Sequence, residues 1–434
     1  MSAKAFVEEL RWRGLLVQIS DEAGLIEHLD AANRVLYCGF DPTADSLHVG
    51  SLVPLLALRR FQLQGHRPLL LLGGATGLIG DPSFRDDERS LNESTTVSSW
   101  VEKLQTQVGR FLDFTAADGS AATIVNNLDW TVDLNVIDFL RDIGKHFSVN
   151  GMIQRDSVKA RLERAEQGIS YTEFSYMLLQ AMDFLRLAQS EGCILQIGGS
   201  DQWGNMVSGI DLIRRHTGKS AFALTTPLVT KADGTKFGKS ASGAIWLDAN
   251  KTSPYTFYQF WLNSADADVS KFLRLFTFLS KTDITHLETL MQEHPERREA
   301  HRKLAQEVTA LVHGPDAVVA AERISEALFA GDTAQLCESD LLQLQQDGLS
   351  SSLCAVGTGL LTALVDAALC KSTGEARKLI QANGIKVNGA QVDDMARALP
   401  FDDALFQRYY LIRKGKKNYH LIVRGDQPNS QEKT

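Results

Sequence analysis

Short apolar segments that alternate with amphipathic ones limit the fold of this chain more than any other feature of its sequence. The apolar segments are too short for helices and are typical of buried strands; they are residues 35–40, 69–72, 123–125 and 193–197. Between them, residues 50–63 and 95–112 carry apolar side chains at helical spacing, and Gly65 is placed to end the first helix. This alternation predicts an α/β fold with a Rossmann-like, doubly wound parallel sheet.

Sheets of this kind bind their ligands at the carboxyl ends of the strands. Two segments with small residues lie at such ends, Tyr37-Cys38-Gly39 and Gly73-Gly74-Ala75. We therefore expect the ligand crevice beside these two segments.

The rest of the chain divides by periodicity and composition. Residues 253–328 are helical in pattern, with aromatic and aliphatic side chains on one face of successive helices, which is typical of a core. A polar stretch follows, and then a basic segment that mixes helix and strand patterns. We expect residues 1–230 to form the Rossmann-like domain with a helical insertion around 130–190, 231–330 an α-helical domain, 331–356 a linker and 357–434 a small α+β domain.

The charge of the chain is uneven along its length. From Lys371 to the end it carries 12 Lys and Arg against 7 Asp and Glu; the whole chain carries 45 against 53, which leaves 33 against 46 before Lys371. A basic segment of this kind either contacts an anionic polymer or only keeps the surface solvated, and charge alone does not decide between the two. Residues 375–380 predict an amphipathic helix and residues 409–423 a hairpin with a cationic loop. The candidate RNA-contacting side chains are Arg377, Lys378, Lys414, Lys416 and Lys417.

Nothing in the sequence indicates a membrane or secreted protein. No segment approaches the ~20 uninterrupted apolar residues of a membrane helix, and the first residues carry charges of both signs without an apolar signal-peptide core. The five cysteines form no CxxC pair, so neither a disulfide framework nor a zinc site is indicated. We expect a cytoplasmic protein with reduced thiols and no metal site.

Residues 39–51 carry a pattern suited to phosphate binding. The first buried strand ends at Gly39, a loop with Asp41 and Thr43 follows, and His48-Val49-Gly50-Ser51 opens a helix. A helix N-terminus presents unpaired N–H groups and the positive end of the helix dipole. His48 adds a directed donor and Gly50 leaves room for close approach. Neither a Walker loop nor a GxGxxG fingerprint is present, and the pattern alone is a weak signal.

A second pattern, Lys236-Phe237-Gly238-Lys239-Ser240, describes a cationic loop. It holds two lysines three residues apart in a run that also contains Gly234 and Gly243. Such a loop can close over a phosphate and neutralise charge as it develops. Alone, it would be interpreted as an ordinary surface turn.

Together, the two patterns resemble the HIGH and KMSKS signatures of class I aminoacyl-tRNA synthetases, in the same order along the chain. Between them, five segments are similar to the tyrosine-specific branch of that class: residues 37–41, 80–83, 126–130, 176–183 and 198–205. The resemblance covers nearly the whole chain, and the basic C-terminal part resembles the small RNA-binding domain of that branch. The chain departs from each signature once: Ser51 replaces the second His of HIGH, and the pair Phe237-Gly238 replaces Met-Ser of KMSKS.

The resemblance implies an ATP-dependent ligase of protein biosynthesis. The carboxylate of L-tyrosine attacks the α-phosphorus of ATP to give tyrosyl adenylate and pyrophosphate, and the terminal ribose of the tRNA for tyrosine then takes the tyrosyl group. Mg²⁺ accompanies the ATP, and no tightly bound prosthetic group is implied. The helical domain would lie on the anticodon side, and a homodimer would form through helices near residues 134–162.

The resemblance also implies roles for individual residues. The catalytic set, which grips the leaving phosphates, is His48, Thr43, Lys236 and Lys239. The ATP-binding set is Gly39, Asp41, His48, Gly50, Asp201, Lys236 and Lys239. For tyrosine, the phenol hydroxyl faces Tyr37 and Asp183, the ammonium group faces Asp81, Tyr176 and Gln180, and the carboxylate and ribose lie near Gln202 and Asp201.

Other functions stay open at this point. A tryptophan-specific relative shares the fold and both signatures, although an indole has no hydroxyl to match Tyr37 and Asp183. A catalytically inactive RNA-binding paralogue would not need His48, Lys236 and Lys239. A dinucleotide-dependent enzyme on the same sheet is disfavoured because its glycine-rich fingerprint is missing.

Overall fold

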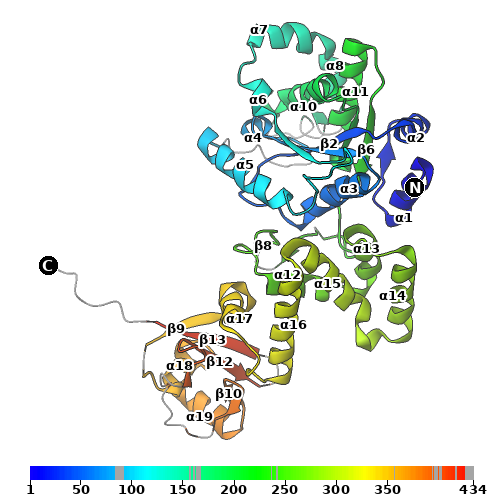
Figure 1. The fold of residues 1–434 in the computed structure, drawn as a ribbon. Helices are drawn as coiled ribbons and strands as arrows, with labels where there is room; N and C mark the ends of the chain where they lie inside the picture. Colours follow the sequence, from blue (N-terminus) through cyan, green and yellow to red (C-terminus); the bar gives the residue numbers. More distant parts are fainter. Residues whose placement is uncertain are drawn as a thin grey trace, which may run out of the picture. The chain divides into compact units, whose positions relative to one another are not determined.

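The chain forms two compact units (Figure 1). Unit 1 consists of Met1–Asp248 and Ser264–Leu304, and unit 2 of Ala249–Asn263 and Ala305–Thr434. The structure is a computed structural model that describes residues 1–83, 92–155, 158–159, 162, 168–235, 237–240, 243–355, 357–392, 394, 399, 403–415 and 418–425.

A six-stranded sheet forms the centre of unit 1, in the order β1-β6-β5-β2-β3-β4. Its strands are β1 (Gln18–Ile19), β2 (Val35–Phe40), β3 (Arg67–Leu72), β4 (Thr123–Asn126), β5 (Leu195–Gly199) and β6 (Phe222–Thr226). All neighbours pair in parallel except β1, which runs antiparallel to β6 at the edge. The predicted doubly wound parallel sheet is thus confirmed, and the antiparallel β1 is an addition that the alternation of strands and helices does not predict.

Helices connect and cover these strands. They are α1 (Ala3–Arg13), α2 (Glu22–Ala31), α3 (Leu52–Leu63), α4 (Thr76–Ile79), α5 (Ser94–Val108), α10 (Tyr171–Ser190) and α11 (Trp203–Thr217). Helix α3 packs on β2, β3, β5 and β6, and α11 packs on β5, β6 and α10. After α3, Gly65 adopts a φ of 89°, a left-handed conformation that costs glycine little and turns the chain into β3. Because helices cover the central strands, β3 is a continuous apolar run rather than an alternating one.

Between β4 and β5, the residues that the structure describes are mostly helical. Besides α10 this segment contains the short helices α6 (Leu128–Thr131), α7 (Val136–Asp138) and α8 (Val149–Ile153), and the turns η2 (Phe139–Ile143) and η3 (Gly144–His146). Its inner side chains, Phe184 among them, share one hydrophobic cluster with Tyr37, Leu69 and Ile213.

The later part of unit 1 contains a small hairpin and two helices. The hairpin pairs β7 (Lys239–Ser240) with β8 (Gly243–Ala244). Helices α13 (Asp266–Phe276) and α14 (Lys281–Glu293) follow, and α15 (Glu299–His313) continues the chain into unit 2.

Unit 2 combines helices with a second sheet. The helices are α12 (Pro254–Leu262), α16 (Pro315–Ala330), α17 (Glu338–Gln343), α18 (Leu360–Asp366) and α19 (Thr373–Gln381). The sheet has the order β11-β10-β12-β13-β9, with β9 (Ser351–Cys354), β10 (Ile385–Val387), β11 (Ala390–Gln391), β12 (Tyr409–Lys414) and β13 (Asn418–Arg424). Residues 231–330 thus contribute to both units, and α17 and β9 lie within the stretch expected as a linker.

None of the helices that the structure describes combines the length and the apolar character needed to cross a membrane. All five cysteines lie in the described part of the chain, and all are free thiols.

Candidate active site

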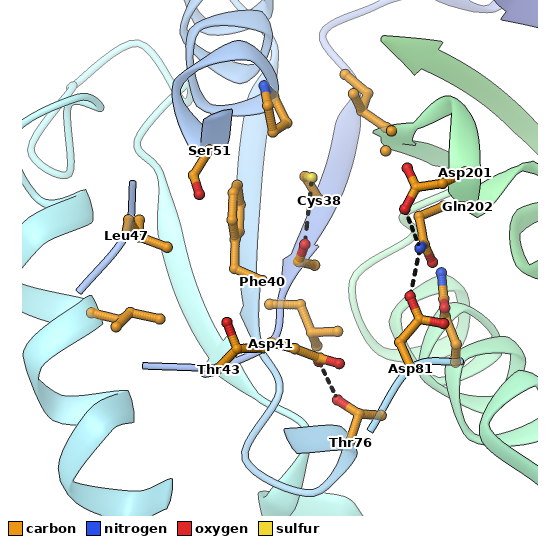
Figure 2. A pocket seen from close by; sticks show the side chains of 18 of the residues that line it. Cys38, Phe40, Asp41, Thr43, Leu47, Ser51, Thr76, Asp81, Asp201 and Gln202 are labelled. Atoms are coloured by element: carbon orange, nitrogen blue, oxygen red, sulfur yellow. Dashed lines mark hydrogen bonds between the residues drawn. The ribbon is translucent and has the colours of Figure 1, made fainter. Parts of the chain in front are cut away.

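A pocket lies at the point where the chain changes direction across the main sheet. Strands β2, β3 and β4 follow one another toward one edge and β5 and β6 toward the other, so the adjacent β2 and β5 flank this switch point. The pocket has a volume of about 280 Å³ and is lined from the carboxyl ends of both strands (Figure 2). Twelve residues predicted for tyrosine or ATP line it: Tyr37, Gly39, Asp41, Thr43, His48, Gly50, Asp81, Tyr176, Gln180, Asp183, Asp201 and Gln202.

One end of the pocket holds a buried carboxyl group. Asp183 lies on α10 with only 1% of its surface exposed. Its oxygens accept hydrogen bonds from Asn127 Nδ2 at 2.9 Å and from Trp130 Nε1 at 2.8 Å. Burial raises the pKa of Asp183 to about 7, and the two hydrogen bonds oppose that rise. The carboxyl is therefore poised between its neutral and ionised forms near neutral pH.

Tyr37 lies at the same end, on β2. Its side chain is fully buried, packs against Phe184 at 5.2 Å between ring centroids, and has a hydroxyl without a hydrogen-bond partner among the described residues. Burial raises the pKa of Tyr37 well above its usual value, with a further contribution from Asp183. An unpaired buried hydroxyl costs free energy unless a ligand supplies the partner. This end of the pocket is therefore built to receive a polar group.

A second carboxylate lies on the loop after β2. Asp41 accepts from Thr76 Oγ1 at 2.7 Å and from the Tyr176 hydroxyl at 2.7 Å; the bond from Thr76 is drawn in Figure 2. Asn127 Nδ2 also donates to Thr76 Oγ1 at 3.0 Å. Because Asn127 bonds both Thr76 and Asp183, a continuous hydrogen-bonded chain connects Asp183 with Asp41.

The wall opposite carries an amide–carboxylate network. Gln202 Nε2 donates to Asp81 at 2.6 Å and to Asp201 at 2.9 Å, as Figure 2 shows. Asn205 Nδ2 donates to the Oε1 atoms of Gln202 and Gln180, at 3.1 and 3.0 Å. Burial raises the pKa of Asp201, and hydrogen bonding from Gln202 opposes the rise. With four carboxylates in one pocket, the site favours a ligand that carries a positive group.

His48 lines the same pocket, just before the turn that leads into α3. Its Nδ1 accepts from Gly50 N at 3.0 Å, and burial lowers the pKa of the imidazole. The ring is therefore neutral with its hydrogen on Nε2, which leaves a directed donor. A side chain at position 50 would meet His48, because a Cβ there would stand 2.7 Å from Cε1. Glycine at this position thus serves the geometry of His48 itself.

The two signature segments lie side by side in the structure. Val49 N donates to Ile245 O at 3.0 Å, Leu247 N to Leu47 O at 2.8 Å, and Ile245 N to Gly238 O at 2.9 Å. These bonds hold the chain after the second signature against the first one. Lys236 lies outside the described residues, and for Lys239 only the backbone, in β7, is described.

The predicted RNA-contacting residues of unit 2 differ in their surroundings. Arg377 and Lys378 are exposed on α19. Lys414 is half-buried; its Nζ donates to Leu369 O and lies 3.6 Å from a carboxylate oxygen of Glu375. Lys416 and Lys417 lie outside the described residues.

Several residues to which the sequence analysis assigned no role hold the pocket together. They are Thr76, Asn127, Trp130 and Asn205, which donate hydrogen bonds to the predicted ligand-binding side chains. Asn127 and Trp130 lie in the segment 126–130, and Asn205 lies in the segment 198–205. Both segments resemble the tyrosine-specific branch, and that resemblance was the available signal.

Comparisons with known proteins agree along most of the chain. Residues 30–330 match the family of tRNA synthetases class I (W and Y), and residues 340–422 match the tyrosine–tRNA ligase SYY-like C-terminal domain. A tyrosine–tRNA ligase of Erwinia tasmaniensis is 54% identical over 97% of this chain and 99% of its own length, and one of Escherichia coli strain 55989 is 54% identical over the same shares.

Solved structures give the same result at the level of the fold. A C-terminally truncated mitochondrial tyrosyl-tRNA synthetase of Aspergillus nidulans matches with a TM-score of 0.66 and 32% identity, over 75% of this chain and 94% of that one. A tryptophanyl-tRNA synthetase of Encephalitozoon cuniculi shares only the fold, at 13% identity, a TM-score of 0.53, and 71% and 86% coverage.

The sheet order, the pocket at its switch point and these matches define a class I aminoacyl-tRNA synthetase. The chain belongs to the family of tyrosine–tRNA ligases. The tryptophan-specific alternative is not favoured, because the relatives that match at high identity over the full length are tyrosine–tRNA ligases.

Proposed function

We propose that this enzyme activates L-tyrosine with ATP and transfers it to the tRNA for tyrosine, with the pocket between β2 and β5 as its active site. The observation that carries the assignment of the pocket is its buried end. Tyr37 presents a hydroxyl there that has no partner among the described residues, and the same end holds the Asp183 carboxyl, whose pKa is raised. A phenol hydroxyl would donate to the Asp183 carboxylate and accept from the Tyr37 hydroxyl. Phenylalanine would leave the Tyr37 hydroxyl unpaired and would deny Asp183 this further hydrogen bond, and an unsatisfied buried polar group costs about 1–3 kcal/mol.

The carboxylates at mid-pocket suit the ammonium group of the amino acid. Asp81, Tyr176 and Gln180 would receive it, and Asp41 orients the Tyr176 hydroxyl by accepting from it. Gln202 is held between Asp81 and Asp201, which leaves this amide fixed near the expected positions of the carboxylate and the ribose. Rigid placement of this kind lowers the barrier by orienting the carboxylate toward the α-phosphorus.

The end of the pocket near α3 suits the phosphates of ATP, which enters with Mg²⁺. Gly39, Asp41, Gly50 and Asp201 would contact the nucleotide. His48 Nε2–H and the Thr43 hydroxyl would bind the leaving pyrophosphate from one side, and Lys236 and Lys239 from the other. Pyrophosphate departure spreads negative charge over these oxygens, so fixed donors and cations stabilise the transition state.

We also propose that the C-terminal part of unit 2 binds the tRNA. The exposed guanidinium of Arg377 and ammonium of Lys378 on α19 support this proposal, since phosphate contacts supply most of the affinity of such surfaces. Lys414, Lys416 and Lys417 would add to the charge. Lys414 is already engaged by Glu375 and Leu369, so its contribution to RNA binding should be the smaller one.

We propose further that the enzyme is a homodimer and works in the cytoplasm. Apolar side chains are exposed near the predicted interface at residues 134–162; Val136 and Ile137 are each 68% exposed, and Val149 is 59% exposed. Exposed apolar groups gathered in one region mark protein interaction surfaces, and a second copy of the chain would cover them.

Amino-acid-dependent exchange of pyrophosphate into ATP tests the activity. We expect exchange with tyrosine and none with phenylalanine or tryptophan, and absence of exchange with tyrosine would refute the proposal. The assignment of the pocket is tested with Asp183→Ala, for which Glu173→Ala, a buried carboxyl on the same helix but not in the pocket lining, serves as control. Only the Asp183 variant should lose the preference for tyrosine over phenylalanine.

A further inference from the structure

Helix α13 holds the segment that leads into the second signature. Near its start, Asp268 is buried, with 3% of its surface exposed, and its Oδ1 accepts from Ala232 N at 2.8 Å. One turn further along, Lys271 Nζ donates to Thr230 O at 2.9 Å. Both bonds fix backbone atoms just before the signature to a rigid helix.

Phe237, the second residue of the signature, is anchored on the same helix. Its ring stacks on Phe276 at 5.3 Å with an angle of 22° between planes, and it lies 4.9 Å from Phe272. The rings of Phe272 and Phe276 are buried, with 2% and 0% exposed. Asp268, Phe272 and Phe276 are spaced four residues apart, so they lie on one face of α13.

Gly238, the residue after Phe237, lies against Val49 of the first signature. Gly238 has a φ of 81°, and a Cβ at this position would stand 2.8 Å from Val49 Cγ2. Because Phe237 contacts α13 and Gly238 contacts Val49, the backbone at Lys239 is held between α13 and the start of α3.

Buried arginines tie α13 back to the helices that precede it. Arg60, on α3, donates through Nη2 to Thr277 O at 2.5 Å. Arg13, on α1, donates to Thr277 O at 3.3 Å and to Leu279 O at 2.8 Å. Thr277 caps the C-terminus of α13 and Leu279 follows it, so both arginines bind the backbone at the point where this helix ends. The helix that starts at the first signature and the helix that anchors the second one are therefore joined at a common point.

We propose that Asp268 and Phe237 are positioning residues for adenylate formation, and that they act by setting where the backbone of Lys239 stands relative to His48. This inference rests on the proposed role of Lys239 at the phosphates of ATP. Neither residue lines the tyrosine pocket, so their loss should leave tyrosine binding intact. A displacement of about 1 Å of a charged group from its place at the transition state costs on the order of 100-fold in rate. Their loss should consequently lower kcat.

The test compares disruptive and conservative variants of both residues. Asp268→Ala removes the acceptor of Ala232 N, whereas Asp268→Asn keeps an oxygen that can accept. Phe237→Ala removes the anchor, whereas Phe237→Met keeps an apolar side chain and restores the residue that the KMSKS signature has there. Asp266→Ala is the matched control, because it makes the same substitution in the same first turn at a side chain that is 71% exposed.

The measurements are kcat and KM for ATP in tyrosine-dependent pyrophosphate exchange, tyrosine Kd by equilibrium dialysis, and the unfolding temperature. We expect both alanine variants at positions 237 and 268 to lose about 10-fold or more in kcat with tyrosine Kd unchanged, and Asp268→Asn, Phe237→Met and Asp266→Ala to stay near the parent enzyme. Parent-like kcat in both alanine variants would overturn the inference, and so would an equal loss of tyrosine affinity, which would indicate general damage to the fold.

Lys239→Ala separates this inference from the function on which it rests. If Lys239→Ala lowers kcat while Asp268→Ala and Phe237→Ala do not, the lysine is catalytic and the positioning role is wrong. If Lys239→Ala has the parent kcat, the proposed role of the lysine is wrong, and the positioning role is refuted with it.

Discussion

The indole Nε1 of Trp130 donates a 2.8 Å hydrogen bond to Asp183 Oδ1 at the buried end of the pocket. Together with Asn127, it stabilises the ionised form of a carboxyl whose pKa burial raises to about 7. The residue proposed to recognise the phenol hydroxyl thus depends on two donors that do not line the pocket themselves.

Replacing Trp130 with Phe should weaken tyrosine binding. The variant keeps the aromatic packing but removes a hydrogen bond of about 1.5–3 kcal/mol that stabilises the ionised carboxyl, so the pKa of Asp183 should rise. Because less of the carboxyl is then ionised at pH 7, tyrosine Kd at that pH should rise by roughly 5- to 10-fold. Trp100→Phe, the same substitution on α5 outside the pocket lining, is the control. Equal tyrosine Kd in the two variants, measured by equilibrium dialysis, would contradict a role for this bond.

Tyrosine binding should depend on pH near neutrality. The ionised Asp183 is the better acceptor for a phenol hydroxyl, and its pKa of about 7 means that the carboxyl gains a proton as pH falls below that value. Because the bound ligand favours the ionised form, binding should release a proton, and tyrosine Kd should rise by up to about 10-fold per pH unit below 7. Equilibrium dialysis between pH 5.5 and 8.5 measures this dependence. Asp183→Asn should bind weakly at every pH, and a parent-like pH profile in that variant would assign the proton to another group.

Gly238→Ala should impair adenylate formation more than Gly234→Ala. Both glycines lie in the left-handed region, with φ values of 81° at Gly238 and 80° at Gly234. Placing alanine in this backbone conformation therefore destabilises the fold by a similar amount, about 1–2 kcal/mol, at either position. Only at Gly238 would the added Cβ also meet Val49 Cγ2, at 2.8 Å; at Gly234 no atom lies within 4 Å. The pyrophosphate exchange rate of Gly238→Ala should fall by about 10-fold more than that of Gly234→Ala. Indistinguishable rates would show that this close approach does not matter.

Removing the C-terminal sheet should spare adenylate formation and impair tRNA charging. The core of this part is formed by residues between Cys354 and Ile422, and β9 pairs with β13. A truncated chain that ends at Leu349 lacks the whole sheet. One that ends at Gly359 keeps β9 but lacks β13, its partner strand. We expect the shorter chain to keep parent-like pyrophosphate exchange, to lose most tyrosyl transfer to tRNA and to aggregate less than the longer one. Parallel loss of exchange and charging in the shorter chain would contradict this division of labour.

Much of the fold was predictable because its determinants are local. The strand at residues 35–40 has the predicted bounds, and the helix predicted at 50–63 is α3 (Leu52–Leu63), which a 3₁₀ turn at Val49–Ser51 precedes. Strand β6 escaped prediction, since Phe222–Thr226 is a short run that ends in two threonines and becomes buried only in the sheet. Strand β1 is held by pairing with β6, and two residues carry no periodicity of their own.

The sequence by itself determined the alternation that makes a doubly wound sheet, because apolar periodicity acts over a few residues at a time. It also determined which chemical groups could stand at the strand ends, including Tyr37, Asp41 and His48. Only the tertiary structure decided that Asn127 and Trp130 orient Asp183, and that Asp268 and Phe237 hold the second signature. These relations join residues that are far apart in sequence and depend on directed hydrogen bonds and ring packing, which arise only when the folded chain brings the partners within bonding distance.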